Sequence, residues 1–329
     1  MIITKKRDYW PTNEWRIASP ESVGIDSNRL FSIDKEIKVR LRGVNCFLII
    51  KNGNIVHEKY FNGYNQRHKN HMCSVTKTVI SALVGIAIDQ GLVRDVNQKI
   101  LDFFPEFKPK NSDYLKNQLS IRHFLTMTTG LLWMNRGMGH EPMFRRLLKE
   151  KNWVKSILNL PIKDRMFGKF QYSSAVSHLL SAIITKISNR SAQDFAEKYL
   201  FRPIGISNNK EWMKDPQGIN IGGYGLKLSP RDMAKFGFLY LNQGRWKDRQ
   251  IISKEWIVES LQNYGEGYGY HVWITKIGDF NAFMAAGYGG QYLTCFPKLD
   301  LIMVITSNAQ LGRWGDPRYI LDRFISNFF

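Results

Sequence analysis

Strand-forming patterns lie near both ends of this 329-residue chain, and helix-forming patterns lie between them. Near the amino end, two apolar, alternating runs at 46–51 and 54–60 are joined through Asn52-Gly53, a strong β-hairpin signal. Near the carboxyl end, further strand-like runs cover 268–275, 280–286, 291–296 and 301–307, with a turn at 297–300. The two end regions can therefore share one antiparallel sheet, and the middle of the chain becomes an insertion.

Helical patterns flank these strands and fill the middle. Apolar residues repeat at three and four positions over 26–39 and 316–329, which predicts one helix before the sheet strands and one after them. The central helices are expected from Ser74 to about Gln90, from Ser120 to about Gly130, over 143–158, over 176–187, and after the capping serines Ser191, Ser229 and Ser253.

These patterns predict an α+β fold, in which an antiparallel β-sheet is flanked by N- and C-terminal helices and carries an inserted, mainly helical lobe. We expect residues 1–78 and 262–329 to form the sheet lobe and residues 79–261 the helical lobe. Because binding sites favour clefts between such units, the functional site is expected in the cleft between the lobes.

The chain is strongly basic, with 47 Lys and Arg against 28 Asp and Glu and a net charge of +19. Such a charge can indicate nucleic acid or an anionic membrane surface as partner. The basic residues are spread along the chain, however, and none joins an aromatic pattern typical of RNA recognition. Arg145, Arg146 and Lys149 alternate with apolar residues, as on the solvated face of a helix. We therefore expect no nucleic-acid partner; acidic substrates or a cell-wide charge bias explain the charge equally well.

Other patterns bear on location and cofactors. No apolar run reaches the roughly 18 residues of a membrane span, and the amino end lacks the apolar core of a signal peptide. Cys46, Cys73 and Cys295 are odd in number and widely spaced, which implies no disulfide framework and favours a cytoplasmic location. Without a zinc-type His or Cys spacing, no metal and no other cofactor is expected. The oligomeric state is left open.

A Ser-x-x-Lys pattern occurs three times, at Ser32–Lys35, Ser74–Lys77 and Ser207–Lys210. The first lies in an amphipathic segment that predicts a surface helix, and the last has the composition of a turn. Only Ser74 begins a segment that is apolar on nearly all sides, as in a buried helix.

A serine and a lysine three residues apart share one face of a helix, within reach of each other. Burial favours the neutral form of an amine, and a neutral amine can accept the proton of a serine nucleophile. Alternatively, Ser74 is only a helix cap and Lys77 extends to solvent.

Five stretches of the sequence, in order and at the right spacing, resemble the serine β-lactamase and penicillin-binding-protein superfamily. The closest resemblance is to its class C branch, which includes esterases, D-aminopeptidases and 6-aminohexanoate-dimer hydrolases. The stretches are 71–77, 121–131, 170–174, 223–234 and 285–291. The resemblance covers the chain from about residue 20 to its end and implies the β-lactamase/transpeptidase-like fold.

The resemblance assigns three catalytic roles. Ser74 matches the acylated serine, Lys77 the lysine one helical turn later, and Tyr172 the tyrosine that acts as general base or acid. A lysine amine and a tyrosine phenol titrate near the same pH in water, and two such neighbours titrate together. Which of Lys77 and Tyr172 accepts the serine proton is therefore left open.

The resemblance also implies a set of substrate-binding residues, namely Ser174, Gly287, Tyr288 and Gly289. The N–H groups of Ser74 and Tyr288 are expected to stabilise the oxyanion. Two departures from the family pattern are informative: Ser174 replaces an asparagine, and 285–287 is Ala-Ala-Gly, where the family usually has a cation that helps to hold a substrate carboxylate. Trp133 either borders the pocket or packs in the core.

Together these features predict a serine hydrolase that cleaves small esters or linear amides through an acyl-enzyme on Ser74. The two departures from the family pattern argue against an efficient β-lactamase or cell-wall peptidase. The alternative is a catalytically silent, penicillin-binding-protein-like molecule that binds a ligand or a partner.

Overall fold

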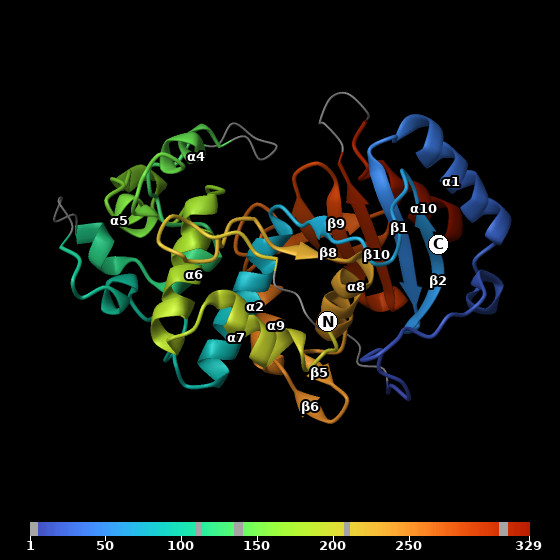
Figure 1. The fold of residues 1–329 in the computed structure, drawn as a ribbon, viewed down its shortest axis with the longest axis horizontal. Helices are drawn as coiled ribbons and strands as arrows, with labels where there is room; N and C mark the ends of the chain where they lie inside the picture. The colour runs from blue at the N-terminus through green and yellow to red at the C-terminus, as the bar shows by residue number, and fades with distance from the viewer. Residues whose placement is uncertain (1–5, 109–113, 135–140, 207–210, 309–314) are drawn as a thin grey trace.

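The computed structural model describes residues 6–108, 114–134, 141–206, 211–308 and 315–329. Six strands form one antiparallel sheet in the order β2-β1-β10-β9-β8-β7. They are β1 (Val44–Lys51), β2 (Asn54–Tyr60), β7 (Trp273–Ile277), β8 (Phe280–Gly287), β9 (Gln291–Phe296) and β10 (Leu301–Ser307). Figure 1 shows the blue strands of the amino end beside the red strand β10 of the carboxyl end. The sheet shared by the two chain ends is thus confirmed.

The hairpin between β1 and β2 turns at the predicted residues. Lys51 pairs with Asn54, and Asn52 and Gly53 both have positive φ angles, of 51° and 79°. Two such residues match the twist of the flanking strands, which is why Asn-Gly is favoured at this turn.

The strand predicted at 268–275 is wrong in its first half, because β7 begins only at Trp273. The segment before it is tied to α9 (Lys254–Ser260): the Tyr270 N–H donates to the Ser260 carbonyl at 2.9 Å, and a Cβ on residue 269 would lie 2.2 Å from that oxygen. These tertiary contacts bend an apolar run that would otherwise suit a strand.

Helices cover both faces of the sheet. On one face lie α1 (Ser27–Arg40) and α10 (Tyr319–Phe328), as predicted, packed against Phe47 and Ile49 of β1. On the other face Leu48 belongs to the larger core that includes α2 (Val75–Asp89) and α8 (Pro230–Leu241). Successive residues of a strand point to opposite faces, so β1 must be apolar at almost every position.

The middle of the chain is mainly helical, as expected. Its other helices are α3 (Ile121–Leu125), α4 (Pro142–Leu147), α5 (Trp153–Leu158), α6 (Ser174–Ser188) and α7 (Ala192–Ala196). Short two-stranded pairs join β3 (Asn70–His71) to β4 (Lys227–Leu228) and β5 (Arg245–Trp246) to β6 (Arg249–Gln250). Helix α8, from the middle of the chain, packs on the sheet against β1, β9 and β10. The division into lobes at 78/79 and 261/262 stays a prediction.

One continuous helix over 143–158 was expected, and this is wrong, since α4 and α5 are separate. The Asn152 side chain accepts a hydrogen bond from the Lys155 N–H at 2.8 Å and so starts a new helix. The apolar spacing survives the break because both short helices pack on the same core.

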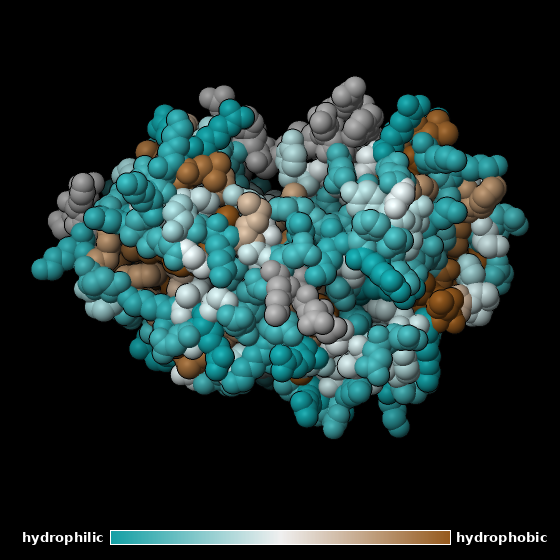
Figure 2. Space-filling model, viewed as in Figure 1, coloured by the Kyte–Doolittle hydropathy of each residue, from teal (hydrophilic) through white to brown (hydrophobic). Residues whose placement is uncertain are grey.

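Figure 2 shows that the viewed face is mainly hydrophilic, with small, separate hydrophobic areas. Among the helices in the described parts of the chain, none is both long and apolar enough to cross a membrane.

Candidate active site

Ser74 and Lys77 meet at the amino end of α2. The Lys77 Nζ lies 2.9 Å from the Ser74 Oγ and donates to the Gly223 carbonyl at 2.7 Å. Lys77 is only 1% exposed, and the Ser74 side chain makes no capping bond to its helix. The alternative of a capping serine and a solvent-reaching lysine is therefore excluded.

The other two Ser-x-x-Lys pairs have no such setting. Ser32 and Lys35 lie on the exposed side of α1, where the Ser32 hydroxyl donates to the Asn28 carbonyl at 3.0 Å. The surface-helix prediction is confirmed. Ser207–Lys210 lies outside the described residues.

A tight turn presents Ser74 to the pocket. The turn follows β3, and the Met72 N–H donates to the Leu226 carbonyl at 2.8 Å. Cys73 then adopts φ +47°, a left-handed conformation that non-glycine residues rarely take and that concentrates at functional sites. Burial raises the pKa of the Cys73 thiol to about 11, so the thiol stays protonated near neutral pH and does not compete with Ser74 as nucleophile.

Two glycines bring the Gly223 carbonyl to Lys77. A Cβ on Gly222 would lie 2.0 Å from the Ser177 carbonyl oxygen, and one on Gly223 would lie 2.8 Å from the Ser174 Cβ. Only glycine allows this segment to lie directly on α6. Lys77 is thus held by a backbone carbonyl from a distant segment of the chain and not by its own helix.

Tyr172 lies beside Lys77. The Lys77 Nζ is 4.9 Å from the centre of the Tyr172 ring, and that ring stacks on Trp273 at 6.1 Å with an interplanar angle of 15°. Tyr172 comes just before α6, and it lines the same pocket as Ser74. The structure therefore brings together all three residues for which the sequence suggested catalytic roles.

Ser174 is held by a carboxylate that sequence reasoning missed. The Ser174 N–H and hydroxyl both donate to Glu141, at 2.7 and 2.5 Å, and the Trp133 Nε1–H donates to the same carboxylate. Glu141 precedes Pro142 at the start of α4, but nothing in the sequence links it to partners 8 and 33 residues away. Trp133, 2% exposed, packs in the core.

The carboxyl end of β8 closes the site from the sheet. Gly287, Tyr288 and Gly289 all line the pocket that contains Ser74. A Cβ on Gly287 would lie 2.5 Å from the Met72 carbonyl oxygen, so only glycine lets the strand approach the turn before Ser74 so closely. The backbone hydrogen bonds of the described chain that lie outside its helices and strands include none from the N–H groups of Ser74 and Tyr288. Both remain available to an oxyanion.

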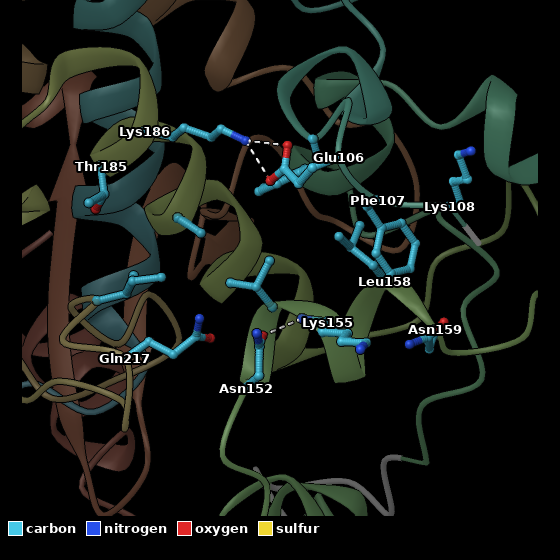
Figure 3. A pocket seen from close by; sticks show the side chains of 14 residues that line it. Glu106, Phe107, Lys108, Asn152, Lys155, Leu158, Asn159, Thr185, Lys186 and Gln217 are labelled. Atoms are coloured by element: carbon cyan, nitrogen blue, oxygen red, sulfur yellow. Dashed lines mark hydrogen bonds and ion pairs between the residues drawn. The ribbon is translucent and has the colours of Figure 1, made fainter. Parts of the chain in front are cut away.

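Two hollows meet at Ser74 and Tyr288. The smaller, about 330 Å³, is also lined by Glu141, Arg145 and Ser174, and the larger, about 730 Å³, by Tyr172 and Trp273. A separate hollow of about 620 Å³ is drawn in Figure 3; its Glu106–Lys186 ion pair spans one side, and it contains none of the predicted site residues. The predicted site residues that line a hollow lie at the first two.

Within the described residues, no three or more His, Cys, Asp or Glu side chains are grouped so that they could hold a metal ion. The groups that the site offers are an alcohol, an amine, a phenol and backbone N–H donors. These are the components of nucleophilic acyl transfer.

Known proteins share this architecture. The family model described as Beta-lactamase matches residues 38–322. The 6-aminohexanoate-dimer hydrolase of Paenarthrobacter ureafaciens is 22% identical over 307 residues, covering 86% of this chain and 76% of that protein. A family VIII carboxylesterase superposes with a TM-score of 0.71 at 19% identity, covering 95% of this chain and 98% of the other. The octameric penicillin-binding protein homologue from Pyrococcus abyssi gives 0.71 and 19%, covering 92% and 76%. The predicted fold is confirmed.

Proposed function

This chain belongs to the beta-lactamase family, and on that premise we propose that it is a serine hydrolase cleaving small esters or linear amides through an acyl-enzyme on Ser74. One observation carries the proposal: the buried Lys77 Nζ lies 2.9 Å from the Ser74 Oγ, at a point where two hollows meet. A serine hydroxyl is a weak nucleophile until a neighbouring base accepts its proton, and this neighbour is in place.

In the proposed reaction the Ser74 oxygen attacks the substrate carbonyl while its proton passes to the pair formed by Lys77 and Tyr172. A neutral Lys77 can keep its N–H bond to Gly223 and turn its lone pair to the Ser74 hydroxyl. The N–H groups of Ser74 and Tyr288 stabilise the tetrahedral oxyanion, and one such donor is typically worth about 3 kcal/mol of barrier.

Collapse of this intermediate expels the alcohol or amine, which takes the proton from the same pair. Water, deprotonated by that pair in turn, attacks the acyl-enzyme and releases the acid. Lys77 and Tyr172 thus serve as base in attack and as acid in departure.

We favour esters and linear amides as the substrate class for two reasons. The family's usual cation is missing from the stretch 285–287. In addition, a 6-aminohexanoate-dimer hydrolase is similar in sequence and a carboxylesterase is similar in fold. A catalytically silent binding protein is not favoured, because the Ser74–Lys77 contact is intact.

A fluorophosphonate probe tests the proposal. The wild-type protein should be labelled at Ser74, and Ser74→Ala should not; p-nitrophenyl acetate hydrolysis should follow the same pattern. A panel of short esters, linear amide dimers and nitrocefin would then rank the substrates. Absence of labelling in a folded wild-type protein would refute the assignment of Ser74 as nucleophile.

The proposed setting is the cytoplasm, with a small molecule as the partner and no nucleic acid. All three cysteines are unpaired, which suits a reducing compartment.

A further inference from the structure

We propose that Arg145 binds a carboxylate on the substrate, so that this enzyme prefers anionic esters or amides to matched neutral ones. The inference rests on the proposed function and specifies further that the substrate carries a negative charge. Arg145 lies on α4 and lines the smaller hollow together with Ser74 and Tyr288. A substrate held there presents its charge within the same hollow as the nucleophile.

The position of Arg145 differs from that of its neighbour. Both Arg145 and Arg146 are exposed, as the sequence predicted for a solvated helix face. Only Arg145 lines a hollow that contains Ser74; Arg146 lines neither of the two. Two adjacent arginines on one short helix therefore provide a site residue and a matched control.

The Arg145 guanidinium is available to a ligand. Glu141 is the one acidic residue among those that line the smaller hollow, and its two oxygens already accept three hydrogen bonds from Ser174 and Trp133. No ion pair joins Arg145 to an acid within the described parts of the chain. Lys77, the nearest buried cation to Ser74, is already hydrogen-bonded to the Gly223 carbonyl.

The two hollows that meet at Ser74 differ in charge. The larger one is lined by two acids, Glu266 and Asp316, and by one cation, Arg318. The smaller one contains Glu141, whose oxygens are taken, and the exposed Arg145. The acid and the cation of the smaller hollow balance each other, whereas the larger hollow has one more acid than cation. An anionic group is therefore better accommodated in the smaller hollow than in the larger, which also orients the substrate across Ser74.

The chemistry of guanidinium suits this role. A planar guanidinium binds a carboxylate through two parallel N–H···O bonds, which are stronger than neutral hydrogen bonds. The strand end at 285–287 offers no charged side chain, so in the smaller hollow a substrate carboxylate is met from the helical wall, by Arg145. The net charge of +19 also draws anionic substrates toward the protein.

Matched ester pairs test the inference. One pair, mono-p-nitrophenyl glutarate and p-nitrophenyl valerate, places the charge on the acyl side. The other pair, 4-acetoxybenzoate and its methyl ester, places it on the leaving group. We expect the wild type to have a higher kcat/KM for the anionic member of at least one pair, mainly through a lower KM, with a preference that weakens as salt is added.

Arg145→Ala should reduce this anionic-to-neutral ratio of kcat/KM about tenfold, the effect of one lost charge-assisted contact. Arg145→Lys should retain part of the preference, Arg145→Glu should reverse it, and Arg146→Ala should leave it unchanged. Since Arg145 is exposed, thermal unfolding should show all these variants folded.

The two levels of the proposal fail separately. If Ser74-dependent hydrolysis occurs but the ratio is the same in wild type, Arg145→Ala and Arg146→Ala, the role of Arg145 is overturned and the hydrolase stands. An equal fall in Arg145→Ala and Arg146→Ala would overturn it too, because only general surface charge would then matter. If no ester is hydrolysed through Ser74, both proposals fall.

Discussion

The Lys77 side-chain nitrogen lies 2.7 Å from the carbonyl oxygen of Gly223, 146 residues further along the chain. This bond ties the first turn of α2 to the segment that lies on α6. Because the same nitrogen is 2.9 Å from the Ser74 Oγ, the Gly223 carbonyl fixes the amine on the proposed nucleophile.

Lys77→Met should abolish most activity and leave the fold intact. Methionine fills a similar buried volume but has no proton-accepting amine, so kcat/KM for a simple ester should fall roughly 10²- to 10⁴-fold. The unpaired Gly223 carbonyl should cost about 1–3 kcal/mol of unfolding free energy. Ester hydrolysis and chemical denaturation measure the two effects. A variant with near wild-type kcat/KM would exclude Lys77 from the proton transfer.

Gly287→Ala should impair activity through the backbone. The new methyl group would lie 2.5 Å from the Met72 carbonyl oxygen, just before the turn that presents Ser74. Overpacking typically costs about 1–3 kcal/mol, and a displaced nucleophile should reduce kcat by tenfold or more, on the order of the known cost of misplacement.

Gly218→Ala is the control for the glycine prediction. Gly218 also has a positive φ, of 82°, but a Cβ there meets nothing within 4 Å. It should lose about 1 kcal/mol of stability from backbone strain and keep its kcat. Equal kcat losses in the two alanine variants would show that general destabilisation, and not the approach of β8 to Ser74, is responsible.

Glu141→Gln should loosen the start of α6. Three donors from Ser174 and Trp133 converge on this carboxylate, whereas an amide would turn its own NH₂ group toward one of them. We expect a loss of about 1–3 kcal/mol in unfolding free energy and a fall in kcat of roughly tenfold, since Tyr172 lies two residues before Ser174. The exposed Glu150→Gln serves as control in both assays, and matching values for the two variants would refute the prediction.

Stability should decline in mild acid because of His271. Burial lowers the pKa of His271 from 6.5 to about 4. Between about pH 6.5 and pH 4, His271 therefore binds a proton in the unfolded chain but not in the folded chain. The free energy of unfolding falls as the pH is lowered through this range. The contribution approaches roughly 3 kcal/mol.

Urea denaturation at a series of pH values between 7.5 and 4.5 measures this loss. His271→Gln should flatten the acid slope, whereas substitution of the exposed His68 should leave it unchanged. An identical slope in wild type and His271→Gln would show that the acid sensitivity arises elsewhere.

Local signals made much of the fold predictable. The Asn52-Gly53 turn, the serine caps at Ser191, Ser229 and Ser253, and the apolar run of α2 each act within a few residues. Each of these signals lies within, or directly beside, the turn or helix that it specifies, so it can be read from the local sequence. The site residues Ser74 and Lys77 belong to the same class, since helix geometry alone places them on one face.

Other features depend on partners that are distant in sequence. The 268–272 segment is apolar enough for a strand, but one hydrogen bond to Ser260 and a close approach to the same carbonyl turn it away from the sheet. Glu141 is one acid among many until the fold brings Ser174 and Trp133 to it. Arg145 resembles its solvated neighbour Arg146 until the hollow beside Ser74 is formed.

The amino-acid sequence by itself determined most of the elements, the shared sheet and the pairing of an alcohol with an amine on one helical turn. Only the tertiary structure decided that Lys77 is buried and held by Gly223, that Tyr172 faces it, and that a carboxylate supports the start of α6. The reason is physical: periodicity and turn chemistry act over a few residues. The environment of a side chain is set by whatever the folded chain brings against it.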